Sequence, residues 1–309
     1  MKKGTHIILN PSAGGGKGKK FCKCLIPELE KRFGKDYLIK ETSRQGDAII
    51  FAREAVESNA GIIVAAGGDG TVNEVVNGIL TAGRSLNDNF DLGILNCGSG
   101  GGLAQTLGIP DSVSDQLDLI CESKPRPFDV GFVIYLDKNK NSCERYFVSE
   151  CQAGIGGSVV SQVGMKLKHF GGKIAFGSVA LSHLVHYKVS EMRLQVDAKT
   201  SATKKMIGVT IGNGIYCAGG MQLTPNALTD DGQLDLLGIH EMNFMTRFLN
   251  FGKVYSGNHV NSKYFSLTRA KEIYLDSGPS VWIEADGELL GKTPCRIGIV
   301  PGAIRVRYR

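Results

Sequence analysis

The glycine-rich segment at residues 67–71, Gly-Gly-Asp-Gly-Thr, constrains the fold of this chain more than any other part of its sequence. It follows an apolar run at residues 61–66, which predicts a buried parallel strand, and precedes residues 72–80, which predict a helix. Glycines let the main chain approach a ligand closely, and a helix N-terminus presents free N–H groups to anions. The segment therefore predicts a phosphate site, with Asp69 placed to influence a metal ion or a nucleophile. The alternative is a tight turn that is merely rich in glycine.

Local details of this turn can also be predicted. Thr71 and Glu74 have the spacing of a capping box, in which each side chain hydrogen-bonds the main chain at the start of a helix. Gly68 is expected to adopt a positive φ, which a β-branched residue could not readily follow.

The first 125 residues alternate between strand and helix patterns. Strands are expected at residues 6–9, 37–40, 62–66 and 92–95, and helices at 17–33, 46–58, 71–82, 101–108 and 112–123. Such alternation predicts an α/β domain over residues 1–125, with a parallel sheet covered by helices on both faces. Ligands of such sheets bind at the carboxyl ends of the strands.

The pattern changes after residue 125. β-type runs are expected at residues 128–135, 146–149, 193–198, 205–211, 234–239, 272–275, 281–285 and 303–308, with helices at 157–169, 173–188 and 242–251. Residues 126–309 are therefore predicted to form a second, β-rich domain with antiparallel character.

Further glycine-rich or small polar turns follow the other strands of the first domain. Residues 10–18 follow the first strand and resemble a P-loop, but no Ser or Thr follows Lys17. They predict either a main-chain nest for phosphate or, if taken alone, a solvated basic loop. Residues 98–104 follow the fourth strand, and Thr42 follows the second. Because four strands end in this way, we interpret the row as a nucleotide cleft.

Composition limits the classes of function. The chain has 309 residues, enough for two domains, and a net charge of +6, which suits phosphate-bearing ligands or an anionic surface but is too weak to indicate nucleic acid. The eight cysteines form no CxxC pair. With no secretory signal and no run long enough to span a bilayer, the sequence predicts a cytoplasmic protein.

Two acidic turns lie in the second half, Asp230-Asp231-Gly232 and Asp286-Gly287-Glu288. Either could be an ordinary hairpin turn. Phosphoryl transfer, however, needs a divalent ion and a base for the acceptor hydroxyl, and the first domain offers few acids besides Asp69 and Glu74.

Together these motifs resemble the diacylglycerol kinase catalytic-domain superfamily, which includes bacterial soluble lipid kinases, sphingosine kinases and ceramide kinases. The similarity runs along essentially the whole chain and is most specific at residues 67–78, with further matches at Asn10-Pro11, residues 98–100 and the two acidic turns. It implies a nucleotide-binding domain of the phosphofructokinase and NAD kinase type, followed by a β-rich domain. It also implies transfer of the γ-phosphoryl group of ATP to a diacylglycerol- or sphingoid-type hydroxyl with Mg²⁺, as part of phospholipid metabolism.

The resemblance also assigns roles to individual residues. The ATP site would be lined by Asn10, Pro11, Ser12, Ala13, Gly14, Thr42, Gly67, Gly68, Asp69, Gly70, Thr71, Val72, Asn73 and Ser99. Glu288 would be the proton acceptor with Asp286 beside it, and Asp69 is the rival base. Asp231 would hold Mg²⁺ through its side chain, helped by the main-chain oxygens of Leu228 and Gln233.

One departure from the family pattern keeps other functions open. Bacterial lipid kinases usually carry Gly-Thr-Gly-Asn-Asp in the second glycine loop, whereas this chain has Gly101 at the Asn position. The alternatives are a kinase with a soluble acceptor, as in NAD kinases, and a nucleotide-binding regulator without catalysis. For a lipid kinase, peripheral membrane contact is expected, and the best candidate in the sequence combines Lys166, Lys168 and Lys173 with Met165, Leu167 and Phe170.

Overall fold

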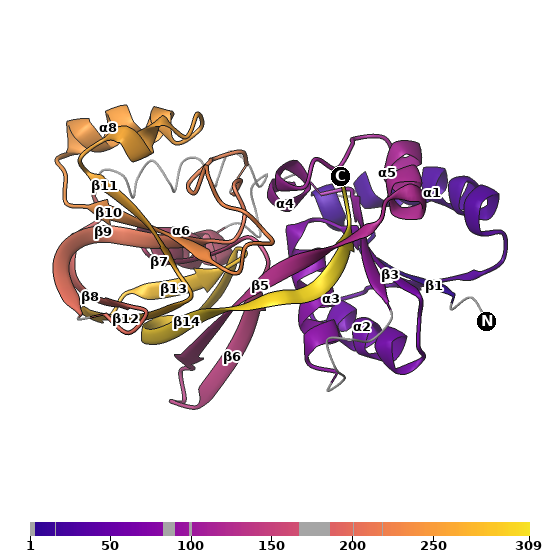
Figure 1. The fold of residues 1–309 in the computed structure, drawn as a ribbon, viewed down its shortest axis with the longest axis horizontal. Coiled ribbons are helices and arrows are strands. Elements are labelled where there is room, and N and C mark those ends of the chain that lie inside the picture. The colour runs from indigo at the N-terminus through magenta and orange to yellow at the C-terminus, as the bar shows by residue number, and fades with distance from the viewer. Residues whose placement is uncertain are drawn as a thin grey trace. The chain divides into compact units, whose positions relative to one another are not determined.

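The computed structural model describes residues 4–15, 17–82, 90–98, 101–166, 186–199, 201–217 and 219–309 (Figure 1). Two compact units divide the chain: residues 1–130 with 301–309, and residues 131–300. The last nine residues thus lie in the first unit, although sequence patterns grouped them with the second half. The reason is a parallel pairing of Val306 with Leu92 in a strand of the first unit.

The first unit alternates strands and helices in the predicted order. Its elements are β1 (Thr5–Leu9), η1 (Ala13–Gly15), α1 (Lys17–Phe33), β2 (Tyr37–Glu41), α2 (Asp47–Glu57), β3 (Ile62–Gly67), α3 (Asp69–Leu80), β4 (Asp91–Asn96), α4 (Gly102–Thr106) and α5 (Val113–Glu122). β1 pairs in parallel with β2 and β3, and β3 pairs in parallel with β4. The four strands therefore end at the same edge.

Helices cover both faces of this sheet (Figure 1). Leu25 and Leu29 of α1 and Leu117 of α5 pack with alternate residues of the strands, including Ile7 and Val64. On the other face, α2 packs against α3 at a very short distance: a Cβ at Gly78 would lie 2.4 Å from the main-chain oxygen of Ile49. Only glycine permits this close packing near the C-terminal end of α3.

The second unit is built mainly from antiparallel strands. Its elements are β6 (Ser142–Phe147), β7 (Glu150–Gly154), α6 (Ile155–Lys166), β8 (Ser190–Val196), β9 (Ala202–Gly212), β10 (Leu234–His240), α8 (Phe244–Lys253), η3 (Asn258–Asn261), β11 (Phe265–Ala270), β12 (Glu272–Gly278) and β13 (Trp282–Ala285). Two long strands, β5 (Pro125–Leu136) and β14 (Glu288–Arg307), have residues in both units.

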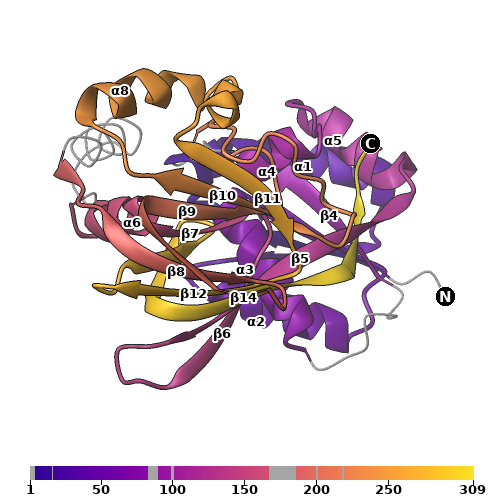
Figure 2. The same cartoon turned by 60° about the vertical axis from the view of Figure 1, so that its left-hand side comes forward.

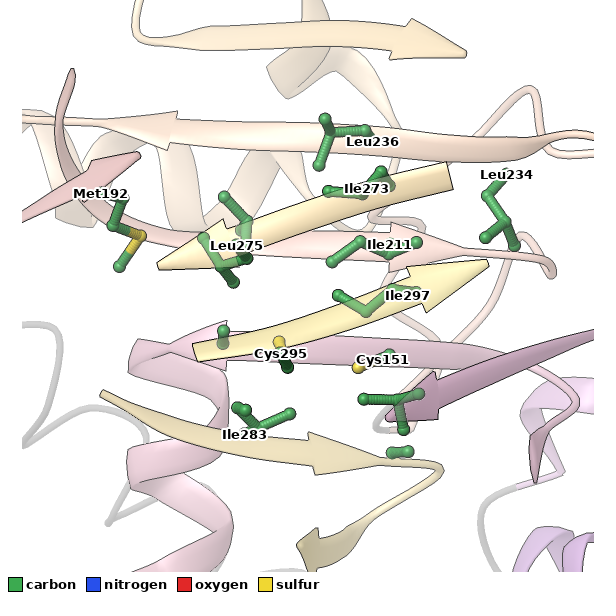
Figure 3. Close-up of a cluster of buried hydrophobic side chains, with 14 of the residues drawn as sticks. Cys151, Met192, Ile211, Leu234, Leu236, Ile273, Leu275, Ile283, Cys295 and Ile297 are labelled. Atoms are coloured by element: carbon green, nitrogen blue, oxygen red, sulfur yellow. The ribbon is translucent and has the colours of Figure 1, made fainter. Parts of the chain in front are cut away.

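Antiparallel pairings close a ring through β9, β8, β12, β14, β13 and β7 (Figure 2). Alternate side chains of these strands point into its interior, where Cys151, Ile211, Ile273, Ile283 and Ile297 are buried together (Figure 3). β10 and β11 extend the sheet from β9. The hairpin between β13 and β14 is packed against this core and carries two of the predicted catalytic carboxylates, Asp286 and Glu288.

The predicted helices over residues 17–33, 46–58, 112–123 and 242–251 coincide closely with α1, α2, α5 and α8. The helix predicted at 173–188 falls on residues outside the described part of the chain, apart from its last three. None of the described helices combines the length and the apolarity that crossing a membrane requires.

Candidate active site

The turn after β1 is held by Asn10, which connects it to two neighbours. The Asn10 N–H donates to the Ala66 oxygen at 2.8 Å, continuing the sheet beyond β1. Its side-chain Oδ1 accepts from the Ser12 N–H at 3.0 Å, and its Nδ2 donates to Thr71 Oγ1 at 3.1 Å. Pro11, Ser12, Ala13 and Gly14 form the turn itself, in which Gly14 has φ 63°. The turn that follows β1 and the glycine-rich segment that follows β3 are therefore joined by a hydrogen bond.

The turn after β3 leads directly into α3 and differs from two predictions. The helix begins at Asp69, with Gly68 as N-cap and no side-chain cap. Gly68 has φ −99°, so it does not need the left-handed region. The capping box is also wrong, because the helix begins two residues before Thr71, and Thr71 and Glu74 bond elsewhere: Thr71 accepts from Asn10, and Glu74 Oε1 accepts from the Gly46 N–H at 3.0 Å.

Space rather than φ explains Gly67 and Gly68 of this turn, whereas a Cβ at Gly70 would meet nothing within 4 Å. A Cβ at Gly67 would lie 2.3 Å from Thr71 Oγ1. A Cβ at Gly98, in the turn after β4, would lie 2.5 Å from the Gly68 Cα. Main chain therefore faces main chain between the two glycine-rich turns, and only glycine permits that contact.

Asp69 connects the same two turns through its carboxylate. It accepts from the N–H groups of Gly102 at 3.0 Å and Leu103 at 3.3 Å, at the start of α4. Burial raises the pKa of Asp69, and the two N–H donors partly oppose that rise. A carboxylate whose pKa is raised by burial is a stronger base than one in water, and so is better suited to accept a proton. This network could not be foreseen from sequence spacing, because it joins residues 33 and 34 positions apart.

The turn after β2 is fixed by two acids. The Thr42 N–H donates to the Leu9 oxygen at 2.8 Å. Asp47 accepts from the N–H and hydroxyl of Ser43 and from the N–H of Arg44, which lowers the pKa of Asp47 to about 2. Glu74, almost fully buried, ties Gly46 to α3. Glu74 thus supports the row of turns rather than capping a helix.

Gly101 occupies the position that sets this chain apart from the usual lipid-kinase pattern. It is the N-cap of α4 and has φ 62°, a conformation that glycine adopts at no cost. A Cβ there would lie 2.9 Å from Asn96 Nδ2. Asn96 in turn accepts from the Gly98 N–H at 3.2 Å, so a side-chain amide remains at this turn. Ser99, the other predicted residue here, lies outside the described residues.

In the second unit, Asp286 and Glu288 occupy the tight turn between β13 and β14 but have different surroundings. Asp286 has φ 46°, and its carboxylate accepts from three main-chain N–H groups, those of Val148, Ser149 and Glu150, at 2.7, 2.9 and 3.0 Å. Glu288 pairs with Arg145 of β6 at 2.6 Å. Asp286 is therefore an anchor of the hairpin, and Glu288 is held in one direction by a cation.

A buried acid beside this turn was missed by the sequence analysis. Glu284 of β13 is 1 % exposed, and its Oε2 accepts from the Gly287 N–H at 2.8 Å. Burial raises the pKa of Glu284 well above its ordinary value, and the neighbouring charge of Glu150 raises it further. Burial also raises the pKa of the Cys217 thiol, which hydrogen-bonds Glu150. The only signal in the sequence is a carboxylate inside an otherwise apolar strand.

The predicted metal ligands centre on Asp231. Its Oδ1 accepts from the Gln233 N–H at 3.0 Å, and its buried Oδ2 makes no hydrogen bond but lies 3.0 Å from Nη1 of Arg269. Carboxylate and main-chain oxygens are the ligands that Mg²⁺ prefers, so the donor set of Asp231, Leu228 and Gln233 fits the ion chemically. A bound cation would have to share Asp231 with Arg269.

Two family models together match most of the chain. The model of the diacylglycerol kinase catalytic domain matches residues 5–133. The model of the YegS C-terminal NAD kinase beta sandwich-like domain matches residues 149–308.

Two curated relatives are similar to the chain over nearly its whole length. A diacylglycerol kinase from Bacillus subtilis (strain 168) is 28% identical over 295 residues, covering 94% of this chain and 92% of the relative. One from Staphylococcus aureus (strain MRSA252) is 29% identical over 294 residues, covering 95% and 89%.

Solved structures show the fold. A putative diacylglycerol kinase from Bacillus anthracis str. Sterne superposes with a TM-score of 0.78 at 24% identity, covering 99% of this chain and 96% of the other. Yeast NADH kinase complexed with NADH superposes with a TM-score of 0.55 at 10% identity, covering 99% and 83%. The chain therefore has the mixed α/β fold of these kinases, with a β-rich C-terminal part.

Proposed function

Since the chain belongs to the diacylglycerol kinase catalytic-domain superfamily, a family of kinases, we propose that it transfers a phosphoryl group. The proposed donor is the γ-phosphoryl group of ATP, and the proposed acceptor is a lipid hydroxyl. The relatives named above are called diacylglycerol kinases, which supports a diacylglycerol-type acceptor ahead of a sphingoid one. In this role the protein works in the cytoplasm and meets its acceptor peripherally at a membrane surface.

One observation carries the nucleotide part of the proposal. The turns after β1, β2, β3 and β4 lie in a row and are tied together by the Asn10–Thr71, Glu74–Gly46 and Asp69–Gly102 hydrogen bonds. Glycine main chain and the N-terminus of α3, a helix of 12 residues, face this row. Free N–H groups and the positive end of the helix dipole favour the phosphates of ATP. The proposed ATP ligands are the residues that the family resemblance assigned to these turns.

Asp69 is proposed as the proton acceptor. Its carboxylate takes the proton of the lipid hydroxyl while that oxygen bonds to the γ-phosphorus, and the bond from the γ-phosphorus to the β-phosphate oxygen breaks. The products are the phosphorylated lipid and ADP. The raised pKa of Asp69 supports this choice over Glu288, whose carboxylate is engaged by Arg145. Asp286 anchors the turn that carries Glu288.

Mg²⁺ is proposed to be held by Asp231 with the main-chain oxygens of Leu228 and Gln233, because the buried Oδ2 of Asp231 makes no hydrogen bond and has the Arg269 guanidinium 3.0 Å away as its counter-charge, a charge that a bound cation would have to share or displace. When bound, the ion would supply positive charge against the phosphates. A second carboxylate lies in the same environment: burial raises the pKa of Asp235, and the charge of Arg269 opposes that rise. The positive charge of Arg269 therefore acts on both carboxylates of this site.

A panel of acceptors tests the proposal. The protein is incubated with radiolabelled ATP and Mg²⁺ and, in separate reactions, with diacylglycerol, sphingosine or NAD. Label in the organic-phase product of diacylglycerol is the expected result. Label in NAD would assign the protein to soluble acceptors, and nucleotide binding without transfer to any acceptor would make it a regulator.

A further inference from the structure

The helix α8 carries its apolar side chains on the surface of the second unit. Leu249 is 64 % exposed, Met245 61 % and Phe248 53 %, and Phe244 and Tyr255 are also exposed. Phe244 and Phe248, and likewise Met245 and Leu249, are four residues apart, which is the spacing of one helix face, and Tyr255 follows just after the helix ends. Figures 1 and 2 show α8 at the outer edge of this unit.

The buried side of α8 is the polar one. Asn250 is 5 % exposed, and its Nδ2 donates to the Thr246 oxygen at 2.8 Å. Arg247 donates to the main-chain oxygens of Met242 and Tyr187 at 3.1 and 2.9 Å, which fixes the helix to the body of the unit. The Asn243 side chain caps the helix by accepting from the Thr246 N–H. The hydrogen bond from Arg247 to Tyr187 joins the helix to another segment of the unit, and the helix presents apolar side chains outward, the opposite of a core helix.

Charge indicates what covers this face. Between Glu241 and Glu272 the chain has no acidic residue, whereas Arg247, Lys253, Lys263, Arg269 and Lys271 are cationic. Lys253 and Lys263 are exposed and border the apolar face in sequence. Aromatic and aliphatic side chains flanked by lysine are the pattern of a helix that lies in a membrane interface and meets anionic head groups.

We infer that α8 docks the protein on an anionic lipid surface, with the side chains of Phe244, Met245, Phe248 and Leu249 entering the interface and Lys253 meeting the head groups. The inference rests on the proposed function, because a long-chain acceptor must be reached within a bilayer. It moves the docking surface away from the Lys166–Lys173 segment predicted from sequence, whose side chains lie outside the described residues.

Vesicle binding of matched variants tests the inference. The variant Phe248→Gln/Leu249→Gln removes two apolar side chains, and Lys253→Glu reverses one charge. The control Ile26→Gln/Ile50→Gln removes two side chains that are 45 % and 47 % exposed on helices of the first unit. For vesicles of phosphatidylcholine and phosphatidylglycerol, the Phe248/Leu249 variant should bind about 10-fold more weakly or worse, and the control should bind like the parent. Parent binding should also weaken between about 0.05 and 0.5 M salt, as the Debye length falls from roughly 14 to 4 Å.

Tryptophan fluorescence reports directly whether α8 enters the membrane interface. The chain has a single tryptophan, Trp282, so Trp282→Phe/Phe248→Trp places the only indole on α8. Its emission should shift to the blue on anionic vesicles and be quenched by brominated lipid. Unchanged emission, or undiminished binding of the Phe248/Leu249 variant, would overturn the inference.

Transfer activity distinguishes a failure of the proposed lipid kinase function from a failure of the docking by α8. Sedimentation tests whether a second copy of the chain covers α8 instead of a membrane. The Phe248/Leu249 variant should keep transfer to acceptor dispersed in detergent and lose it on vesicles. If transfer fails for the parent in both formats while vesicle binding still depends on α8, the proposed function fails and the docking stands. If this variant instead dissociates an oligomer of the parent and binds vesicles normally, α8 is an interface between copies and the docking is overturned.

Discussion

The side chain of Asn10 donates a hydrogen bond to Thr71 Oγ1 over 3.1 Å, joining residues 61 positions apart in the sequence. Through this bond the turn after β1 and the first turn of α3 become one structure. Asp69 and Glu74 extend the connection to the turns after β4 and β2. A row of glycine-rich turns held in this way presents main-chain N–H groups in fixed directions, which is what recognition of a triphosphate requires.

Replacing Asp69 by Asn should abolish most transfer without unfolding the protein. The amide keeps one acceptor for the Gly102 and Leu103 N–H groups but cannot take a proton, so the rate should fall on the order of 10²-fold or more. Transfer of label and a thermal unfolding curve are measured together. The control Asp115→Asn changes an exposed acid of α5. A variant at Asp69 with near-normal turnover would exclude the carboxylate from the chemistry.

Replacing Gly98 by Ala should weaken ATP binding, because the new Cβ would lie 2.5 Å from the Gly68 Cα and force the two glycine turns apart. We expect the dissociation constant for ATP, measured by calorimetry, to rise about 10-fold or more, since a 1 Å displacement of a binding group can cost as much. Gly252→Ala is the matched control, because a Cβ there meets nothing within 4 Å. Equal affinities of the two variants would show that contact between these turns does not shape the nucleotide site.

Asp286 and Glu288 should differ in what they contribute to stability. Asp286→Ala leaves the N–H groups of Val148, Ser149 and Glu150 without their acceptor and should lower the free energy of unfolding by about 1–3 kcal/mol. Glu288→Gln removes one charge of a partly exposed pair and should cost about 1 kcal/mol or less. Urea unfolding of both variants measures the difference. The reverse order of stability would mean that Asp286 is not the anchor of the hairpin.

Glu284 should make stability depend on pH. Its pKa in the folded state is raised above the ordinary value of 4.5, so its contribution is fully present below pH 4.5 and is lost as pH rises through the folded pKa. Glu284→Gln keeps an acceptor for the Gly287 N–H and cannot ionise. The free energy of unfolding of the variant should therefore fall less than that of the parent between pH 5 and pH 9.

Glu191→Gln, which changes an exposed acid of β8, serves as the control for that comparison and should follow the parent at every pH. Parallel pH curves for the parent and the Glu284 variant would show that Glu284 is ionised in the folded protein throughout this range.

Local patterns predicted the elements of the first unit because apolar periodicity and glycine turns are encoded within short segments. The same reasoning failed for Thr71 and Glu74, whose capping spacing was satisfied by partners far along the chain, Asn10 and Gly46. It also missed β11, where a strand of mixed polarity is fixed by its pairing with β10. Glu284 was missed because its role depends on burial beside Glu150, and burial is a tertiary property.

Phosphoryl transfer to a lipid can be followed in one reaction mixture by phosphorus NMR. The protein is incubated with ATP, Mg²⁺ and detergent-dispersed diacylglycerol, and the spectrum resolves the products. We expect a lipid phosphomonoester resonance that grows in equal amount with ADP and is absent with Asp69→Asn. Release of inorganic phosphate alone, or unchanged ATP with every lipid hydroxyl offered, would contradict this expectation.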